Sequence, residues 1–133
     1  MIKKMILPVL TTLALIAPIS VYGLPLTDPA SLAKQCRTVS QKLAQISLAQ
    51  SDHSCISILE DAVIDTESAA KYLEHEAYHA AKNHLHSANN GLKYAIIIGC
   101  ENSLEIDVAK NELLEINGLI IDDKSSMSSV ASQ

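Results

Sequence analysis

Four of the five histidines of this chain lie in one short segment, at positions His75, His79, His84 and His86. On a continuous helix, His75 and His79 would stand one turn apart, and their imidazoles could bind one divalent metal ion. Glu76 or Glu74 would complete such a site. Imidazole suits Cu²⁺, Zn²⁺ and Ni²⁺, and the general order of affinities favours copper. The segment therefore predicts a transition-metal site.

Residues 75–79 also match the H-E-x-x-H pattern of zinc peptidases, in which the Glu polarises a metal-bound water. Leu85, however, stands where the longer metzincin motif has its third His, and the Gly of that motif is missing. The Ala77-Tyr78 pair departs from the apolar-Gly pair of zincin helices, and the chain is too short to build a substrate cleft. The sequence leaves enzymatic activity open but favours a non-catalytic protein.

A helical projection at about 100° per residue separates the histidines into two groups. The polar face carries His75, His79, His86, Lys82 and Asn83. His84 alone points into an Ala-rich stripe. His86 lies about 10 Å further along the axis than His79, so it would form half of a second, weak site with Asn83 or Asn90. The alternative is that the polar-face histidines are solvated and His84 is a hydrogen-bonded core residue.

The composition around these histidines resembles a known family. Residues 80–86 read AAKNHLH, and the stretch continues to Gly99 and on through the DVAK of residues 107–110. This pattern is similar to that of small His-rich periplasmic metal-binding proteins of the SmbP type. The resemblance implies a short helical bundle after a signal peptide that binds copper and other divalent metals without catalysis. Family members carry His in nearly every repeat, whereas the last predicted helix here has none and Tyr94 stands where a His would be expected.

The three cysteines, Cys36, Cys55 and Cys100, allow at most one internal disulfide. Cys36 lies within a helical stripe, which favours a packed, inert thiol. Cys55 and Cys100 each lie at a helix edge. If the chain folds back near His75, both reach the same end of the bundle and could form a bridge; if the long helical stretch stays straight, they remain apart.

Apolar residues recur at helical spacing over most of the chain. Asp28 and Pro29 are a helix start signal, and the stripe that follows is Leu32, Cys36, Val39, Leu43 and Ile46. The second stripe runs through Leu59, Val63, Thr66, Ala70, Leu73, Ala77, Ala80 and His84. A helix over residues 54–88 would be roughly 50 Å long, so we expect either one long helix or two joined by a bend.

The remaining elements are shorter. Asn89, Asn90 and Gly91 indicate a helix stop, and residues 92–98 predict a short helix or, alternatively, a buried strand. The last helix would begin at Asn102 or Ser103, follow the stripe Ile106, Ala109, Leu113 and Ile116, and end at Gly118. The sequence thus predicts an all-α fold: a small antiparallel bundle of three or four helices within residues 24–121.

Both ends of the chain differ from this domain. Residues 1–23 begin with Lys3 and Lys4, continue with an apolar stretch and end in Val21-Tyr22-Gly23, which is typical of a secretory signal peptide. A membrane anchor is the alternative, weakened by Pro8 and Pro18. Residues 122–133 are Ser-rich and predict a disordered tail. We therefore expect an exported protein, periplasmic or secreted, with no membrane span after processing.

The chain has 133 residues and a formal net charge of −5, which becomes −7 once Lys3 and Lys4 are removed with the signal peptide. Such an acidic chain has no basic stripe for nucleic acid, and its length excludes a Rossmann fold or a TIM barrel. Two functional hypotheses remain: a non-catalytic protein that binds Cu, Zn or Ni through its histidines, or a secreted helical bundle that recognises a protein or lipid partner.

Overall fold

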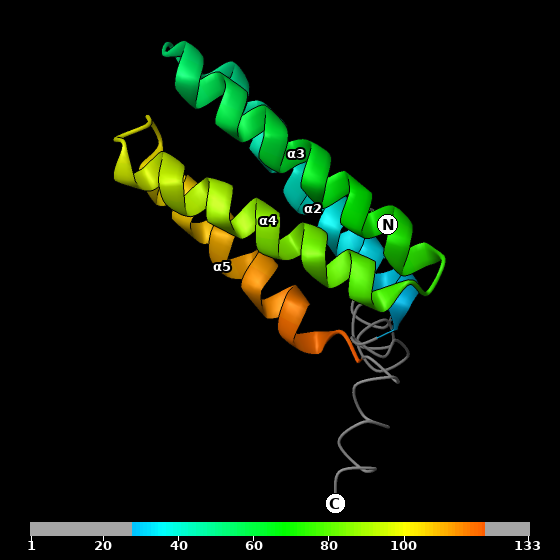
Figure 1. Ribbon diagram of the computed structural model, residues 1–133. Helices are drawn as coiled ribbons and strands as arrows, with labels where there is room; N and C mark the ends of the chain where they lie inside the picture. The colour runs from blue at the N-terminus through cyan, green and yellow to red at the C-terminus, as the bar shows by residue number, and fades with distance from the viewer. Residues whose placement is uncertain (1–27, 122–133) are drawn as a thin grey trace, which may run out of the picture.

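The computed structural model describes residues 28–121, and the predicted signal peptide and tail lie outside them. These residues form four helices: α2 (Pro29–Leu48), α3 (His53–Glu74), α4 (Tyr78–Ile97) and α5 (Ser103–Leu119). Figure 1 shows them running alternately in opposite directions, each beside the next, and α5 returns to contact α2. The all-α antiparallel bundle is confirmed, the number of helices is four, and the described residues contain no strand.

The first helix begins where the sequence indicated. Asp28 is the N-cap of α2 and accepts a hydrogen bond from the Ser31 amide at 3.3 Å, with Pro29 at the first helical position. Asn102 is the N-cap of α5 but has a left-handed backbone (φ 63°), and its side chain donates to Glu105 Oε1 at 3.2 Å. α5 therefore starts without the side-chain cap that the sequence predicted.

Two predicted helix stops are wrong. α4 continues through Asn89, Asn90 and Gly91 to Ile97, so residues 92–98 form neither a separate helix nor a strand. Gly91 instead lies against α3, where an added Cβ would be 3.9 Å from Ile58 Cγ2. That distance is an ordinary van der Waals contact, so Gly91 lies within the helix facing α3 and does not end it. α5 likewise passes through Gly118 and ends at Leu119.

The long helical stretch is broken at residues 75–77. His75 is the C-cap of α3, and Glu76 adopts a left-handed backbone with φ 57°. The Glu76 amide donates to Leu73 O (3.1 Å) and the Ala77 amide to Tyr72 O (2.8 Å), which is the Schellman pattern of a helix end. α3 and α4 are therefore an antiparallel pair, and of the two alternatives that the sequence left open, two helices joined by a bend is the correct one.

The core follows helical stripes of Leu, Ala and Ile. Its largest fully buried apolar side chains are Leu32, Leu43, Leu59, Leu73, Leu85, Leu92, Ile106 and Leu113. On α4 the buried stripe passes through Ala81, Leu85 and Ala88, one residue away from the predicted Ala77, Ala80 and His84. The break at Glu76 resets the helical phase, so the stripe of α3 does not continue in register into α4.

Four antiparallel helices bring the chain back to the end where it started. Figure 1 shows the beginning of α2 and the end of α5 at the same end of the bundle as the α3–α4 turn. The α2–α3 and α4–α5 loops lie together at the opposite end. None of the helices in residues 28–121 is both long and apolar enough to cross a bilayer.

Candidate functional site

The predicted metal ligands His75 and His79 do not share a helix. His75 ends α3 at the turn, whereas His79 is the second residue of α4, and the left-handed Glu76 lies between them. The expectation that their imidazoles occupy adjacent turns of one helix is therefore wrong. The Glu76 carboxylate accepts a hydrogen bond from the Tyr78 hydroxyl at 3.3 Å. The H-E-x-x-H match consequently lacks the continuous helix on which its chemistry depends.

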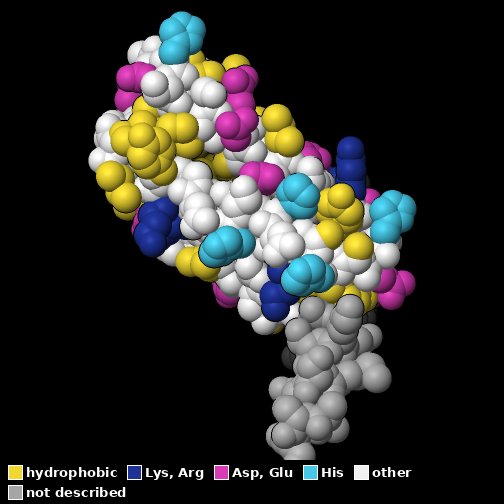
Figure 2. Space-filling model, viewed as in Figure 1, with side chains coloured by type: hydrophobic (Ala, Val, Ile, Leu, Met, Phe, Trp, Pro, Cys, Tyr) yellow, Lys and Arg dark blue, Asp and Glu magenta, His cyan; other side chains and the backbone are white. Residues whose placement is uncertain are grey.

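The remaining histidines are dispersed over the surface. His75, His79 and His86 are exposed, and His84 is half-buried between α3 and α4. Figure 2 shows histidine side chains spread over the half of this face nearer the α3–α4 turn, with a further one at the far end of α3. Within residues 28–121, no three His, Cys, Asp or Glu side chains stand close enough together to hold one metal ion.

His84 has the most specific environment of the histidines. Its Nδ1 lies 3.0 Å from Asp65 Oδ1 across the α3–α4 interface, and its ring stacks on Tyr72 with centroids 5.3 Å apart and planes 16° apart. Ser87 Oγ donates to the other carboxylate oxygen of Asp65 at 2.8 Å. His84 is thus a hydrogen-bonded interface residue at the edge of the core rather than a member of the buried Ala stripe. Ser87 bonds to Asp65 and not to His84, so this trio does not form a nucleophile–base pair.

An ion pair joins α2 to the end of α3, next to the turn. Arg37 forms a bidentate contact with Glu74, with Nη1–Oε2 at 2.6 Å and Nη2–Oε1 at 3.1 Å. The hydrogen bonds from Arg37 hold the pKa of the Glu74 carboxylate below its ordinary value of 4.5. Glu74, which the sequence suggested as an additional metal ligand, is thus paired with Arg37 in this structure.

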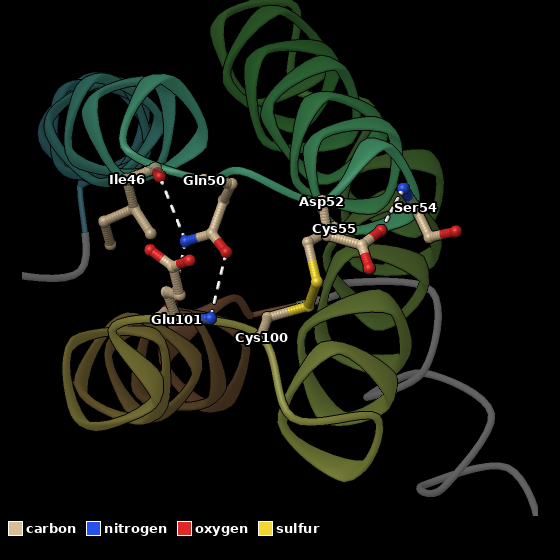
Figure 3. Close-up of a disulfide and its surroundings, with 7 residues drawn as sticks. All are labelled: Ile46, Gln50, Asp52, Ser54, Cys55, Cys100 and Glu101. Carbon is tan, nitrogen blue, oxygen red and sulfur yellow. Dashed lines mark hydrogen bonds between the residues drawn. A yellow bond between two sulfur atoms is a disulfide. The ribbon is translucent and has the colours of Figure 1, made fainter.

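The opposite end of the bundle is joined covalently. Cys55, at the start of α3, and Cys100, in the α4–α5 loop, form a disulfide (Figure 3), as expected for a chain that folds back near His75. Beside it, the Gln50 side chain donates to Glu101 O at 2.8 Å and accepts from the Glu101 amide at 2.9 Å. Gln50 Nε2 also donates to Ile46 O at 3.2 Å. The two loops are consequently held together by one covalent bond and a pair of hydrogen bonds.

The third cysteine, Cys36, remains a free thiol in the core, as the helical stripe predicted. Burial raises its pKa to about 12, because the surrounding apolar side chains disfavour the thiolate. Since thiol–disulfide exchange requires a thiolate, Cys36 is a poor nucleophile in the folded protein. The pairing of Cys55 with Cys100 is thus protected from exchange within the fold.

Large apolar side chains are exposed at the disulfide end, which we define as residues 48–55 and 97–104. Leu48 is 87% exposed, Leu104 77% and Ile97 72%. Figure 2 shows a group of hydrophobic side chains over the region where α4 ends. Around the α3–α4 turn the exposed side chains are mostly polar: Lys71, Glu74, His75, Glu76 and His79, with Tyr72 39% exposed among them. The two ends of the α3–α4 pair thus differ in the chemistry that they present to solvent.

Two neighbouring hollows flank the outward side of α3. The hollow between α2 and α3 has a volume of about 510 Å³ and is lined by Ala44, Ser47, Leu48, Ser57, Glu60, Asp61, Val63 and Ile64. The hollow between α3 and α4 has about 370 Å³ and is lined by Ile58, Asp61, Ala62, Ile64, Asp65, Ser87, Gly91 and Tyr94. Asp61 and Ile64 border both. We call the surface formed by Leu48, Glu60, Asp61, Ile64 and Tyr94 the α3 face.

The Gln50 bridge, the Asp65–His84 contact and the α3 face were not predicted from the sequence. The first two join residues far apart in the chain, and only the antiparallel arrangement brings them together. A signal for the α3 face was present, because Ile64 lies off the apolar stripe of its helix. Comparison with known proteins adds no further site: no protein-family model, no curated protein and no solved structure matches the chain.

Proposed function

We propose that the chain is an exported, non-catalytic helical bundle that recognises a protein partner through apolar side chains at and near its disulfide end. The observation that carries the proposal is the exposure of Leu48, Ile97 and Leu104 there. Single exposed apolar residues are common, whereas three large ones at the same end of a small domain offer apolar area that a partner could bury. Burying such side chains against a partner would supply the main favourable term of binding.

The disulfide supports both export and binding. A bond between Cys55 and Cys100 persists in an oxidising compartment, which agrees with the signal peptide predicted for residues 1–23. The same disulfide and the Gln50–Glu101 hydrogen bonds hold the α2–α3 and α4–α5 loops in place. Leu48, Ile97 and Leu104 lie next to these loops. A surface held in place before binding loses less conformational entropy when a partner docks.

Site-specific photo-crosslinking in cells that produce the protein tests this proposal. A photoreactive amino acid at position 104 samples the disulfide end, and the same amino acid at position 76 is the control at the α3–α4 turn, because Leu104 and Glu76 are both exposed. We expect a discrete protein adduct from position 104 and none from position 76. Equal labelling from both positions, or adducts to lipid alone, would contradict the proposal.

Metal binding through the histidines is a second candidate, supported by one feature of His84. Its Nδ1 faces the Asp65 carboxylate at 3.0 Å. A carboxylate in this position favours the tautomer in which Nδ1 donates and Nε2 is free to bind a metal, as for many metal-bound histidines. The proposed ions are Cu²⁺ or Zn²⁺, with His84 as the anchor.

Calorimetric titration with Cu²⁺ and with Zn²⁺ tests this second candidate. We expect affinity at the micromolar level or tighter, lost in His84→Ala and retained in the control His53→Ala, which alters an exposed histidine at the other end of α3. Loss only in the double variant His75→Ala/His79→Ala would move the site to the α3–α4 turn. Identical titration curves for all variants would contradict a histidine site.

A further inference from the structure

The α3 face combines apolar and acidic side chains in one place. Ile64 is 61% exposed and separates the two hollows, with Leu48 lining one and Tyr94 lining the other. Glu60 and Asp61 are exposed beside Ile64. Figure 2 shows acidic and hydrophobic side chains next to one another over the first half of α3. The surface therefore offers hollows for apolar side chains together with negative charge.

No basic side chain lines either hollow. The sequence explains why, since Lys and Arg are absent from the whole stretch between Lys42 and Lys71, which contains most of α3 and the end of α2. Lys42 itself lies toward α5, where it pairs with Glu112 at 3.2 Å. Among the described residues, Glu60 and Asp61 are not part of any ion pair. Their negative charge therefore faces solvent without neutralisation from this chain.

From this combination we infer that the α3 face is the docking surface for a basic polypeptide segment, one whose apolar side chains are flanked by Lys or Arg. The inference deepens the proposed function and rests on it. Apolar anchors would enter the hollows on either side of Ile64, and the flanking cations would pair with Glu60 and Asp61. An amphipathic helix is the segment that best presents apolar and basic residues side by side. The same negative charge disfavours an anionic lipid surface.

A pair of synthetic peptides tests the inference on the full protein. The probe is a fluorescently labelled amphipathic helix of Leu and Lys, and its control has Glu in place of every Lys. We expect saturable binding by fluorescence anisotropy, at least about tenfold tighter for the Lys peptide, because only that peptide complements the acidic side chains. Added salt should weaken binding of the Lys peptide, since these charges are exposed.

Matched variants localise the binding. Ile64→Ser should weaken it about tenfold or more, whereas Leu114→Ser, at a comparably exposed leucine on α5, should leave it unchanged. Glu60→Gln/Asp61→Asn should remove most of the salt dependence. The matched control is Glu105→Gln/Glu115→Gln, which removes two acidic charges from α5.

The outcomes separate this inference from the proposed function. Equal losses in the α3 and α5 variants would show adsorption to an acidic protein and would overturn the α3 face. Loss in Leu104→Ser but not in Ile64→Ser would keep a partner site at the disulfide end while overturning the α3 face. Self-association abolished by Ile64→Ser, or binding to anionic vesicles, would assign this face to a second copy or to lipid instead and would also overturn the inference.

Discussion

The chain turns twice with the same backbone geometry, after α3 and after α4, but holds the two turns by different means. At the first turn the Glu76 amide donates to Leu73 O and Glu76 has a left-handed backbone; at the second the Gly99 amide donates to Ile96 O and Gly99 has φ 84°. Glycine adopts this conformation without steric cost, whereas glutamate does not. The same helix-ending motif therefore occurs once with glycine, its usual residue, and once without it.

The means of stabilisation differ as well. The second turn is joined to the rest of the bundle by the Cys55–Cys100 disulfide and by Gln50, while the first is supported by the exposed Arg37–Glu74 ion pair. The covalent attachment is found at the end where Leu48, Ile97 and Leu104 are exposed. The exposed Arg37–Glu74 contact is found at the turn that carries His75 and His79. The disulfide end is therefore the better preorganised of the two for binding.

Removing the disulfide should have the largest effect. Its cysteines are separated by 45 residues, and a loop of that length predicts a loss of about 4 kcal/mol in the free energy of unfolding for Cys55→Ser/Cys100→Ser. Chemical denaturation monitored by circular dichroism measures this loss in the free energy of unfolding. A reductant should destabilise the wild type by a similar amount and leave the double variant unchanged. A loss below about 1 kcal/mol would mean that the loops are held chiefly by non-covalent contacts.

The Gln50 bridge comes next. Gln50→Ala removes three hydrogen bonds at a buried position and leaves the Glu101 backbone groups without these partners, so we expect a loss of about 2 kcal/mol in the free energy of unfolding. Gln41→Ala, at an exposed position of α2, is the control and should change the free energy of unfolding very little. Equal effects of the two substitutions on the free energy of unfolding would show that the Gln50 bridge does not stabilise this end of the bundle.

Exchanging the residue types of the two turns should give smaller and opposite effects. Glu76→Gly relieves a left-handed glutamate and should raise the free energy of unfolding by up to about 1 kcal/mol, while Gly99→Ala should lower it by about 1 kcal/mol. Gly118→Ala is the control, because an added Cβ also meets open space there but the backbone is helical. Gly118→Ala should raise the free energy of unfolding slightly, because alanine favours the helix more than glycine does. If Gly118→Ala destabilised the protein instead, backbone conformation would not be the cause of the effect of Gly99→Ala.

The ion pair at the first turn should have the smallest effect, and one that depends on pH. Because Arg37 lowers the pKa of Glu74 in the folded state, the pair contributes stability above the ordinary Glu pKa of 4.5. That contribution is lost as the pH falls through the folded-state pKa. Wild type should therefore exceed Glu74→Gln slightly in stability at about pH 7 and match it in strong acid. A difference that persists in acid would point to packing rather than charge.

Much of the fold could be predicted because its signals are local. Asp28 and Pro29 mark the start of α2, and the periodic apolar residues give the helices and their buried sides. The turn at residues 75–77 could be named only as one of two alternatives, since a non-glycine residue takes the left-handed position and the apolar spacing continues across it. At Gly91 the sequence signal predicted a helix end that is absent, because the residue lies inside α4 with a helical backbone.

The candidate sites were harder to predict than the fold. The prediction of His75 and His79 as metal ligands depended on an unbroken helix. Because the helix breaks at Glu76, His75 lies at the end of α3 and His79 at the start of α4. Asp65 and His84 come together only because α3 and α4 pair in antiparallel fashion, which spacing along the chain does not reveal. Cys55 and Cys100 were identified as a pair that only a folded-back chain would bridge, because three cysteines limit the alternatives.

The even number of antiparallel helices has a practical consequence for handling the protein. Because α2 begins and α5 ends beside the α3–α4 turn, a support or reporter attached at Asp28 or at Ile121 is anchored to that side of the bundle. Immobilised in this way, the protein would direct Leu48, Ile97 and Leu104 away from the support and toward whatever flows past it. Attachment at an engineered cysteine near the opposite loops would reverse this orientation and hide those side chains.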